Sequence, residues 1–236
     1  MRRGRLCAPD ATVKYDAVIT AAGRLPPAAA ARYATDVKAL VRVGGAPLLS
    51  SLVAALRAAV GVARIVVVGP ASARHASRDA DEWIDEKDTG AANVVAALDA
   101  ARTRRALYCA SDLPFLSADA VMEFLANVPA TADVAYPIVM RDAFLRRYPG
   151  APRRFARLAD GDWTGGSVFL VDAPLLLRRS DLLARVFDRR KSVAGLARLM
   201  GPAVLWRFAT GRLTVLDLER RGWTSGRGHA DRHPRR

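Results

Sequence analysis

The sequence predicts an α/β fold in which helices cover both faces of a mainly parallel sheet. Two observations predict it: short, almost wholly apolar segments alternate with segments whose apolar residues recur at helical spacing. Wholly apolar strands are typical of parallel sheets, because helices bury both of their faces. At 236 residues, 51% of them hydrophobic, the chain can bury a large core, and one domain is the default.

The first half of the chain shows the alternation most clearly. Pro47 suits the first turn of a helix, and Thr89 or Asp88, and then Ser117, can cap two later helices. The expected elements are strands at 17–21, 64–68 and 106–110, and helices at 47–60, about 89–102 and about 117–127.

The second half is expected to add strands at 134–139 and 167–171, and helices near 173–188 and 191–200. The last fifteen residues, GWTSGRGHADRHPRR, show no periodicity and are expected to be disordered or loosely attached. The predicted organisation is an N-terminal extension over 1–14, one domain over 15–221 and a basic tail over 222–236.

The net charge of +14 raises the question of nucleic acid as a partner. The basic residues are spread along the sequence without interleaved aromatics, and only four of them are lysines, so the excess is typical of codon composition. Nucleic-acid binding is therefore disfavoured as the main role.

Two further features concern the compartment. Cys7 and Cys109 are the only cysteines, which fits a reducing environment, excludes a cysteine-based zinc site and makes Cys109 a small core residue. We expect a cytoplasmic protein without a membrane segment, because no apolar run has the length of a membrane span and no signal peptide follows Met1.

In an open parallel sheet, ligands bind at the carboxyl ends of the strands. The first such loop holds Ala22, Gly23 and Arg24, whose small side chains let a ligand approach the backbone and whose N–H groups suit phosphate oxygens. Arg24 could add a positive charge. A tight turn without a ligand explains the same residues, and the absence of G-x-G-x-x-G disfavours a dinucleotide site.

Two charged residues are candidates to join this loop. Lys38 precedes a Gly44-Gly45 turn and supplies the ammonium that a triphosphate needs, although a lone lysine is usually a solvated surface residue. Asp112 follows directly on the strand at 106–110 and is a natural oxygen ligand for Mg²⁺; the alternative is a turn aspartate.

Four segments together resemble the MobA-like nucleotidyltransferase family over about residues 16–220: VITAAGR, KALVRVGGAPLL, ASDLPFLS and TGGSVFLV. The family includes molybdenum-cofactor guanylyltransferase and sugar- and alcohol-phosphate nucleotidyltransferases. The resemblance implies a Rossmann-like fold and transfer of a nucleoside monophosphate from an NTP, GTP or CTP before others, with release of pyrophosphate. It also implies Mg²⁺ or Mn²⁺ and a small-molecule acceptor with a phosphate or hydroxyl group.

The resemblance also implies roles for individual residues. The backbone of Ala21, Ala22 and Gly23 would cradle base and phosphates with Arg24 beside them, Lys38 would bind the phosphates, and Asp112 would hold the metal. Asn93 would lie near base or ribose, although a first-turn polar residue explains it equally. Gly165, Gly166 and Lys191 would serve the acceptor, with a hairpin turn and a solvated basic run as alternatives.

The chemistry needs no covalent intermediate, which accounts for the lack of a Ser/His or Cys/His pair. His229, Asp231 and His233 could bind metal but lie in the basic tail, where chance explains them.

The sequence departs from the family in two places. The first loop lacks the usual G-x-G-x-R-M-G, which predicts a loop that is mobile without nucleotide. The expected C-terminal strand with an acidic residue is replaced by the tail, which we attribute to truncation or a change of frame, and Asp217 forms a helix capping box with Thr214 instead. A nucleotide-binding protein with weak or lost catalysis is therefore the alternative function.

Overall fold

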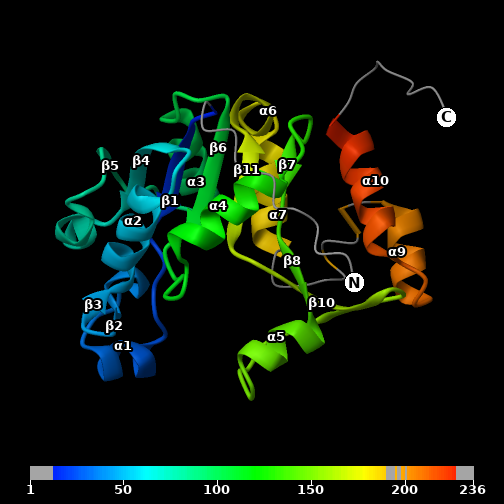
Figure 1. The fold of residues 1–236 in the computed structure, drawn as a ribbon, viewed down its shortest axis with the longest axis horizontal. Helices are drawn as coiled ribbons and strands as arrows, with labels where there is room; N and C mark the ends of the chain where they lie inside the picture. Colours follow the sequence, from blue (N-terminus) through cyan, green and yellow to red (C-terminus); the bar gives the residue numbers. More distant parts are fainter. Residues whose placement is uncertain (1–12, 190–194, 196–197, 200, 227–236) are drawn as a thin grey trace. The chain divides into compact units, whose positions relative to one another are not determined.

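The computed structural model divides the chain into two compact units. Unit 1 comprises Met1–Pro137 and Ser167–Leu183, and unit 2 comprises Ile138–Gly166 and Ala184–Arg236. The structure describes residues 13–189, 195, 198–199 and 201–226, and of 221–226 only the backbone (Figure 1). The expected domain limits at residues 15 and 221 stay predictions.

Unit 1 is built on a six-stranded sheet in the order β5-β4-β1-β6-β11-β7. The neighbours β5, β4, β1 and β6 are parallel, and β11 is antiparallel to both β6 and β7. This confirms the predicted mainly parallel sheet. The strands are β1 (Tyr15–Thr20), β4 (Val62–Gly69), β5 (Glu82–Asp85), β6 (Arg105–Ala110), β7 (Val134–Ala135) and β11 (Val168–Asp172).

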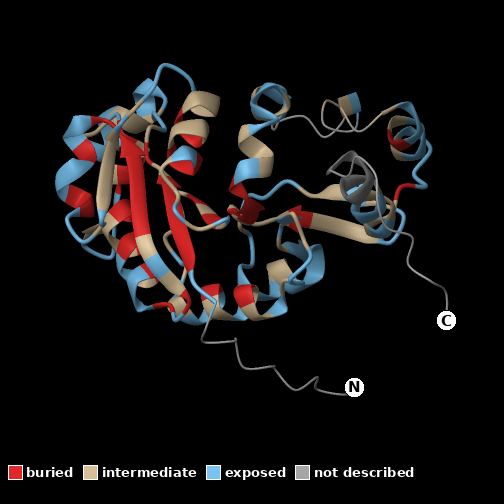
Figure 2. Ribbon diagram, turned by 90° about the horizontal axis from the view of Figure 1, so that it is seen from above, coloured by how far each residue is buried: buried red, intermediate tan, exposed pale blue. Residues whose placement is uncertain are grey.

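The central strand β1 is buried on both faces, as its apolar sequence predicts. Ala17, Val18 and Ile19 are fully buried, and Ala17 pairs with Ile65 on one side and Leu107 on the other. Figure 2 shows in red the buried strands in the middle of the large sheet. Alternate side chains of β1 therefore contribute to the cores on opposite faces of the sheet.

Helices cover both of these faces. Leu52 and Leu56 of α2 and Val121 of α4 share one core with Ala17 and Ile19, whereas α3 packs with α6 and contacts β1 and β4. The helices and 3₁₀ turns of this unit are α1 (Pro27–Tyr33), η1 (Lys38–Leu40), α2 (Leu48–Ala58), η2 (Ala71–Ser77), α3 (Gly90–Asp99), α4 (Ala118–Asn127) and α6 (Ala173–Leu177).

The predicted helix caps are present. The Thr89 hydroxyl accepts the Ala92 N–H at 3.1 Å, and the Ser117 hydroxyl accepts the Ala120 N–H at 3.2 Å. These bonds satisfy N–H groups that the first turn leaves without helical partners. A short hairpin of β2 (Arg42–Val43) and β3 (Ala46–Pro47) turns through Gly44 and Gly45, both at positive φ.

The second half differs from the sequence prediction. The strand expected at 134–139 is split into β7 and β8 (Ile138–Met140), which belong to different sheets, and Pro137 between them has no N–H for pairing. The helix expected at 173–188 is two helices: α6, which starts at the Asp172 cap and ends by Arg178, and α7 (Ser180–Arg189). The helix expected at 191–200 lies largely outside the described residues.

Unit 2 holds an antiparallel sheet in the order β8-β10-β9 and several helices. Its other elements are α5 (Arg141–Arg147), β9 (Ala156–Leu158), β10 (Gly161–Gly165), α9 (Pro202–Ala209) and α10 (Val215–Gly226). Helix α10 includes residues 222–226, so these first five residues of the expected tail are helical. The rest of that tail lies outside the described residues.

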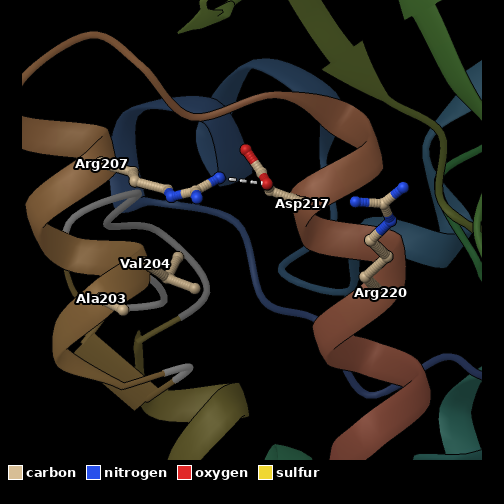
Figure 3. A pocket seen from close by; sticks show the side chains of 5 residues that line it. All are labelled: Ala203, Val204, Arg207, Asp217 and Arg220. Carbon is tan, nitrogen blue, oxygen red and sulfur yellow. Dashed lines mark hydrogen bonds and ion pairs between the residues drawn. The ribbon is translucent and has the colours of Figure 1, made fainter.

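The predicted capping box of α10 is present. The Asp217 N–H donates to the Thr214 hydroxyl at 3.2 Å, and the Thr214 N–H donates to Asp217 Oδ2 at 3.1 Å. The Thr214 hydroxyl bond, the Thr214 N–H bond and the Arg207 guanidinium hold the pKa of Asp217 below its usual value. In Figure 3, Asp217 and Arg207 lie at the hollow between α9 and α10, over Ala203 and Val204.

The positive charge is not evenly divided between the units, contrary to the interpretation that basic residues are simply spread along the chain. Unit 1 holds 18 basic and 16 acidic residues, and unit 2 holds 19 and 7. Codon composition would enrich both units alike, so it does not account for the concentration of charge in the smaller unit.

Two remaining expectations concern burial. Cys109 is fully buried in the core, as predicted, and burial raises the pKa of its thiol to about 12. Within the residues that the structure describes, no helix combines the length and apolar character that crossing a bilayer requires.

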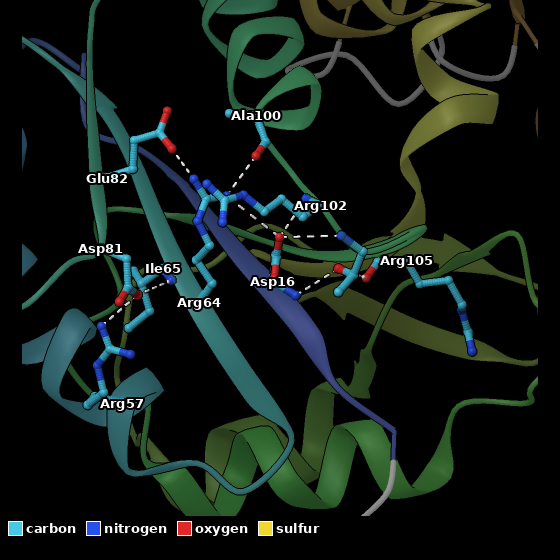
Figure 4. A network of polar contacts seen from close by, with 10 residues as sticks. Asp16, Arg57, Arg64, Ile65, Asp81, Glu82, Ala100, Arg102 and Arg105 are labelled. Atoms are coloured by element: carbon cyan, nitrogen blue, oxygen red, sulfur yellow. Dashed lines mark hydrogen bonds and ion pairs between the residues drawn. The ribbon is translucent and has the colours of Figure 1, made fainter.

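A buried carboxylate fastens the amino ends of the central strands. Asp16 is 2% exposed, and its Oδ2 accepts the Arg102 N–H at 2.6 Å and lies 3.7 Å from Arg64 Nη1 (Figure 4). Arg64 also donates to the Ala100 carbonyl at 2.7 Å and to Glu82. Asp16 therefore ties β1 to the segment before β6 and to β4.

We predict that Asp16→Ala lowers the free energy of unfolding by about 3 kcal/mol, because it leaves Arg64 and buried N–H groups without their acceptor. Urea unfolding followed by circular dichroism measures the change. Asp119→Ala, which removes an exposed carboxylate, is the control and should stay within about 0.5 kcal/mol of the wild type. Equal stability of both variants would contradict the structural role of Asp16.

Candidate functional site

The parallel strands of unit 1 end together at one edge of the sheet. Strand β1 ends at Thr20, β4 at Gly69, β5 at Asp85 and β6 at Ala110. Residues 21–24, Glu86 and Asp112 follow three of these ends. Arg24 pairs with Glu86, and Lys38 bonds to both Gly23 and Asp112, so these loops meet.

Lys38 and Asp112 form an ion pair at this edge. Their Nζ and Oδ2 atoms are 2.5 Å apart although the residues are 74 positions apart in sequence. The two side chains are 45% and 33% exposed, so both remain accessible to a ligand. The Lys38 N–H donates to the Gly23 carbonyl at 2.9 Å, which fixes the lysine beside the loop after β1.

The small residues of this loop have different roles. Ala21 is fully buried, and its N–H donates to the Val68 carbonyl at 2.7 Å, so this amide belongs to the sheet and not to a free phosphate cradle. A Cβ at Gly69 would lie 3.0 Å from Ala21 Cβ and 3.1 Å from Trp83 Cη2, closer than side chains normally pack. Ala21 and Gly69 are therefore small because the core requires it.

Gly23 is different. A Cβ there would meet Lys38 Cβ at 3.7 Å and Cδ at 3.8 Å, which is ordinary contact distance. Gly23 and the half-buried Ala22 are the members of this loop whose small size the core does not explain.

Two residues that were predicted to contact the nucleotide bond to other residues of the protein. Arg24 forms an ion pair with Glu86, with 2.5 Å between Nη2 and Oε1. Asn93 is 3% exposed, and its Oδ1 accepts the Lys87 N–H at 2.7 Å. Asn93 is therefore not the exposed first-turn residue that was the alternative interpretation.

The predicted acceptor residues belong to unit 2. Gly165 ends β10, where its carbonyl accepts a hydrogen bond from the Arg153 guanidinium, and Gly166 follows it. Lys191, like His229, Asp231 and His233, lies outside the described residues.

The acidic side chains at this edge of the sheet determine which metal ion the site could hold. Throughout the described parts of the chain, no three His, Cys, Asp or Glu side chains gather as a metal site. Asp112 offers one carboxylate at this edge, and its Oδ2 accepts a hydrogen bond from Lys38 Nζ. This donor set fits Mg²⁺, which proteins commonly hold through one or two carboxylates with substrate phosphates completing the shell.

Glu86 is the residue at this edge that the sequence analysis missed. It follows β5, a four-residue strand whose acidic ends conceal it. The sequence signal that could have predicted β5 is the pair of apolar residues Trp83 and Ile84, which follows β4 in the chain.

The sequence matches the family described as the MobA-like NTP transferase domain over residues 17–200. The chain belongs to the MobA-like NTP transferase family. No curated protein matches it. A hypothetical transferase from Thermus thermophilus is 32% identical with a TM-score of 0.77, covering 90% of this chain and 88% of that chain.

Two solved structures with lower sequence identity share the fold of this chain. CMP:2-keto-3-deoxy-manno-octonic acid synthetase complexed with CTP is 18% identical, with a TM-score of 0.56 over 79% of this chain and 85% of its own. The 2-C-methyl-D-erythritol 4-phosphate cytidylyltransferase of Thermus thermophilus is 19% identical, with a TM-score of 0.50 over 90% of this chain and 99% of its own. Membership of the MobA-like NTP transferase family supports a nucleotidyltransferase type of activity.

We predict that alanine substitutions at Gly69 and Gly23 differ in their effect on stability, because only Gly69 is closely packed in the core. Gly69→Ala should lower the free energy of unfolding by about 1–3 kcal/mol, because the added methyl group overpacks Ala21 and Trp83. Gly23→Ala should change it by less than about 0.5 kcal/mol, because its methyl group meets only ordinary contacts. Urea unfolding of the two variants checks this, and a larger loss for Gly23→Ala would contradict it.

Proposed function

We propose that the protein transfers a nucleoside monophosphate from an NTP to a phosphorylated or hydroxyl acceptor and releases pyrophosphate. The observation that carries the proposal is the Lys38–Asp112 pair, held at the carboxyl edge of the sheet beside Gly23. Membership of the MobA-like NTP transferase family supports it.

Lys38 places an ammonium where triphosphate oxygens would lie if the nucleotide enters over Gly23. An acceptor oxygen attacks the α-phosphorus, and the bond to the β-phosphate oxygen breaks with its electron pair leaving on pyrophosphate. A hydroxyl acceptor loses its proton to solvent, and a phosphate acceptor has none to lose. Lys38 stabilises the charge that grows on the leaving group.

Asp112 would hold Mg²⁺ or Mn²⁺ together with the substrate phosphates. A bound metal supplies charge neutralisation across the α-phosphate and the leaving pyrophosphate. Without nucleotide, Lys38 and Asp112 neutralise each other. On nucleotide binding, the Lys38 ammonium would turn from Asp112 to phosphate, which would free the carboxylate to hold a metal.

Two other observations support a choice of nucleotide base and of acceptor. We propose CTP or GTP as the nucleotide; the CTP complex of the structurally similar synthetase supports CTP. The excess of basic over acidic residues in unit 2 supports an acceptor that carries negative charge, such as a phosphate.

We predict that the protein releases pyrophosphate when incubated with its NTP, Mg²⁺ and a phosphorylated acceptor. Asp112→Ala should lower kcat/KM by about 100-fold or more, because the metal loses its protein ligand. Asp119→Ala makes the same charge change at an exposed position seven residues later and is the matched control. Screening each NTP against a panel of acceptor phosphates with a pyrophosphate assay provides the measurement.

Two results separate the alternatives. Nucleotide-induced thermal stabilisation without turnover would support the alternative function, a nucleotide-binding protein that has lost catalysis. Turnover in which Asp112→Ala equals Asp119→Ala would reject the assigned site.

We also predict that nucleic acid binds weakly and that Lys38 is not needed for that binding. Oligonucleotide affinity would be measured at several salt concentrations. Tight binding with a steep salt slope that survives Lys38→Ala would support a nucleic-acid-binding role instead.

A further inference from the structure

Arg24 is held by three acceptors on the protein itself. Its Nη1 donates to the Ala22 carbonyl at 2.9 Å, its Nη2 lies 2.5 Å from Glu86 Oε1, and its Nε lies 3.4 Å from Asp36 Oδ2. Each nitrogen of the guanidinium therefore faces an oxygen. Two carboxylates against one guanidinium leave a negative local balance, which does not attract a triphosphate.

The carboxylate that holds Arg24 is itself fixed through the backbone. The Glu86 N–H donates to the Gly69 carbonyl at 3.0 Å, which extends the pairing of β5 with β4 by one residue. The next residue, Lys87, donates its N–H to Asn93 Oδ1 at 2.7 Å and accepts from Asn93 Nδ2 at 3.4 Å. Asn93 thus uses both ends of its amide on one residue of the segment that contains Glu86.

The other side of Arg24 is tied to the approach to Lys38. Arg24 forms a β-bridge with Val37, and the Leu25 N–H donates to the Asp36 carbonyl at 2.8 Å. The next bond in this direction joins the Lys38 N–H to the Gly23 carbonyl. A shift of Arg24 would therefore move both the loop after β1 and the backbone of Lys38.

We propose that Arg24, Glu86 and Asn93 are positioning residues: a connected clamp from α3 to the loop after β1 that sets the spacing of Gly23 and Lys38 for the nucleotide. The clamp rests on the proposed nucleotidyl transfer. Arg24 acts through the backbone of the loop and does not bind phosphate. Asn93 acts through Lys87 and does not bind the base.

The substitution Glu86→Gln distinguishes a positioning role of Arg24 from a phosphate-binding role, because the two roles predict opposite changes in the Kd for Mg²⁺–NTP. If Arg24 positions the loop, the loss of its ionic partner loosens the loop, and the Kd for Mg²⁺–NTP rises about 3–10-fold. If Arg24 were a phosphate ligand, the same change would free its guanidinium, and the nucleotide would bind more tightly.

The experiment measures the Kd for Mg²⁺–CTP and Mg²⁺–GTP by calorimetry, and kcat and KM with the active pair. The variants are Arg24→Ala, Glu86→Gln and the double variant. The matched control is Arg57→Ala, because Arg57 also bonds a carboxylate, Asp81, and a backbone carbonyl at similar exposure, but Asp81 lies at the amino end of β5.

We expect each clamp variant to raise Kd and KM with kcat within about twofold of the wild type, and the double variant to be no worse than Arg24→Ala. Arg57→Ala should match the wild type. Tighter or unchanged nucleotide binding by Glu86→Gln, or additive losses in the double variant, would overturn the clamp. Absence of wild-type turnover would overturn the proposed transfer, while the Kd comparison would still decide the clamp.

Discussion

The parallel pairing of β1 between β4 and β6 is the constraint on which the rest of the structure depends. It requires the three strands to end at one edge, because their N–H and C=O ladders run in the same direction. Asp16 fastens the opposite, amino end of this group through the Arg102 amide and Arg64. With that end fixed and both faces buried by helices, a slip in register would expose core side chains. The positions of the loops at the other edge follow from this rigidity.

Opposite charges at that edge are held in pairs. Lys38 lies against Asp112, and Arg24 against Glu86 and Asp36. All of these side chains are partly exposed, so each pair adds little to stability. The pairs differ in one respect: Lys38 and Asp112 face each other alone among the described residues, whereas Arg24 is bound on all sides. This difference is why we assign phosphate and metal to the first pair and positioning to the second.

The sequence predicted most of the fold and the meeting of Gly23, Lys38 and Asp112 at one edge of the sheet. Long apolar strands such as β1 and β4 are visible in it because burial on both faces leaves no polar positions. Strand β5 was missed because four residues with acidic ends lack that signal, and Glu86 was missed with it. The contacts of Arg24 and Asn93 depend on partners that only the tertiary structure brings near, so residue type alone could not predict them. In the second half, Pro137 divides a strand whose apolar pattern is continuous.

The most direct test of the central claim is a crystal structure with a non-hydrolysable NTP analogue and Mn²⁺, in which anomalous scattering locates the metal. We predict a Mn²⁺ peak at the Asp112 carboxylate bridged to the phosphates, with Lys38 Nζ moved from Asp112 to a phosphate oxygen and Arg24 still paired with Glu86. Nucleotide bound elsewhere with the Lys38–Asp112 pair intact would contradict the account.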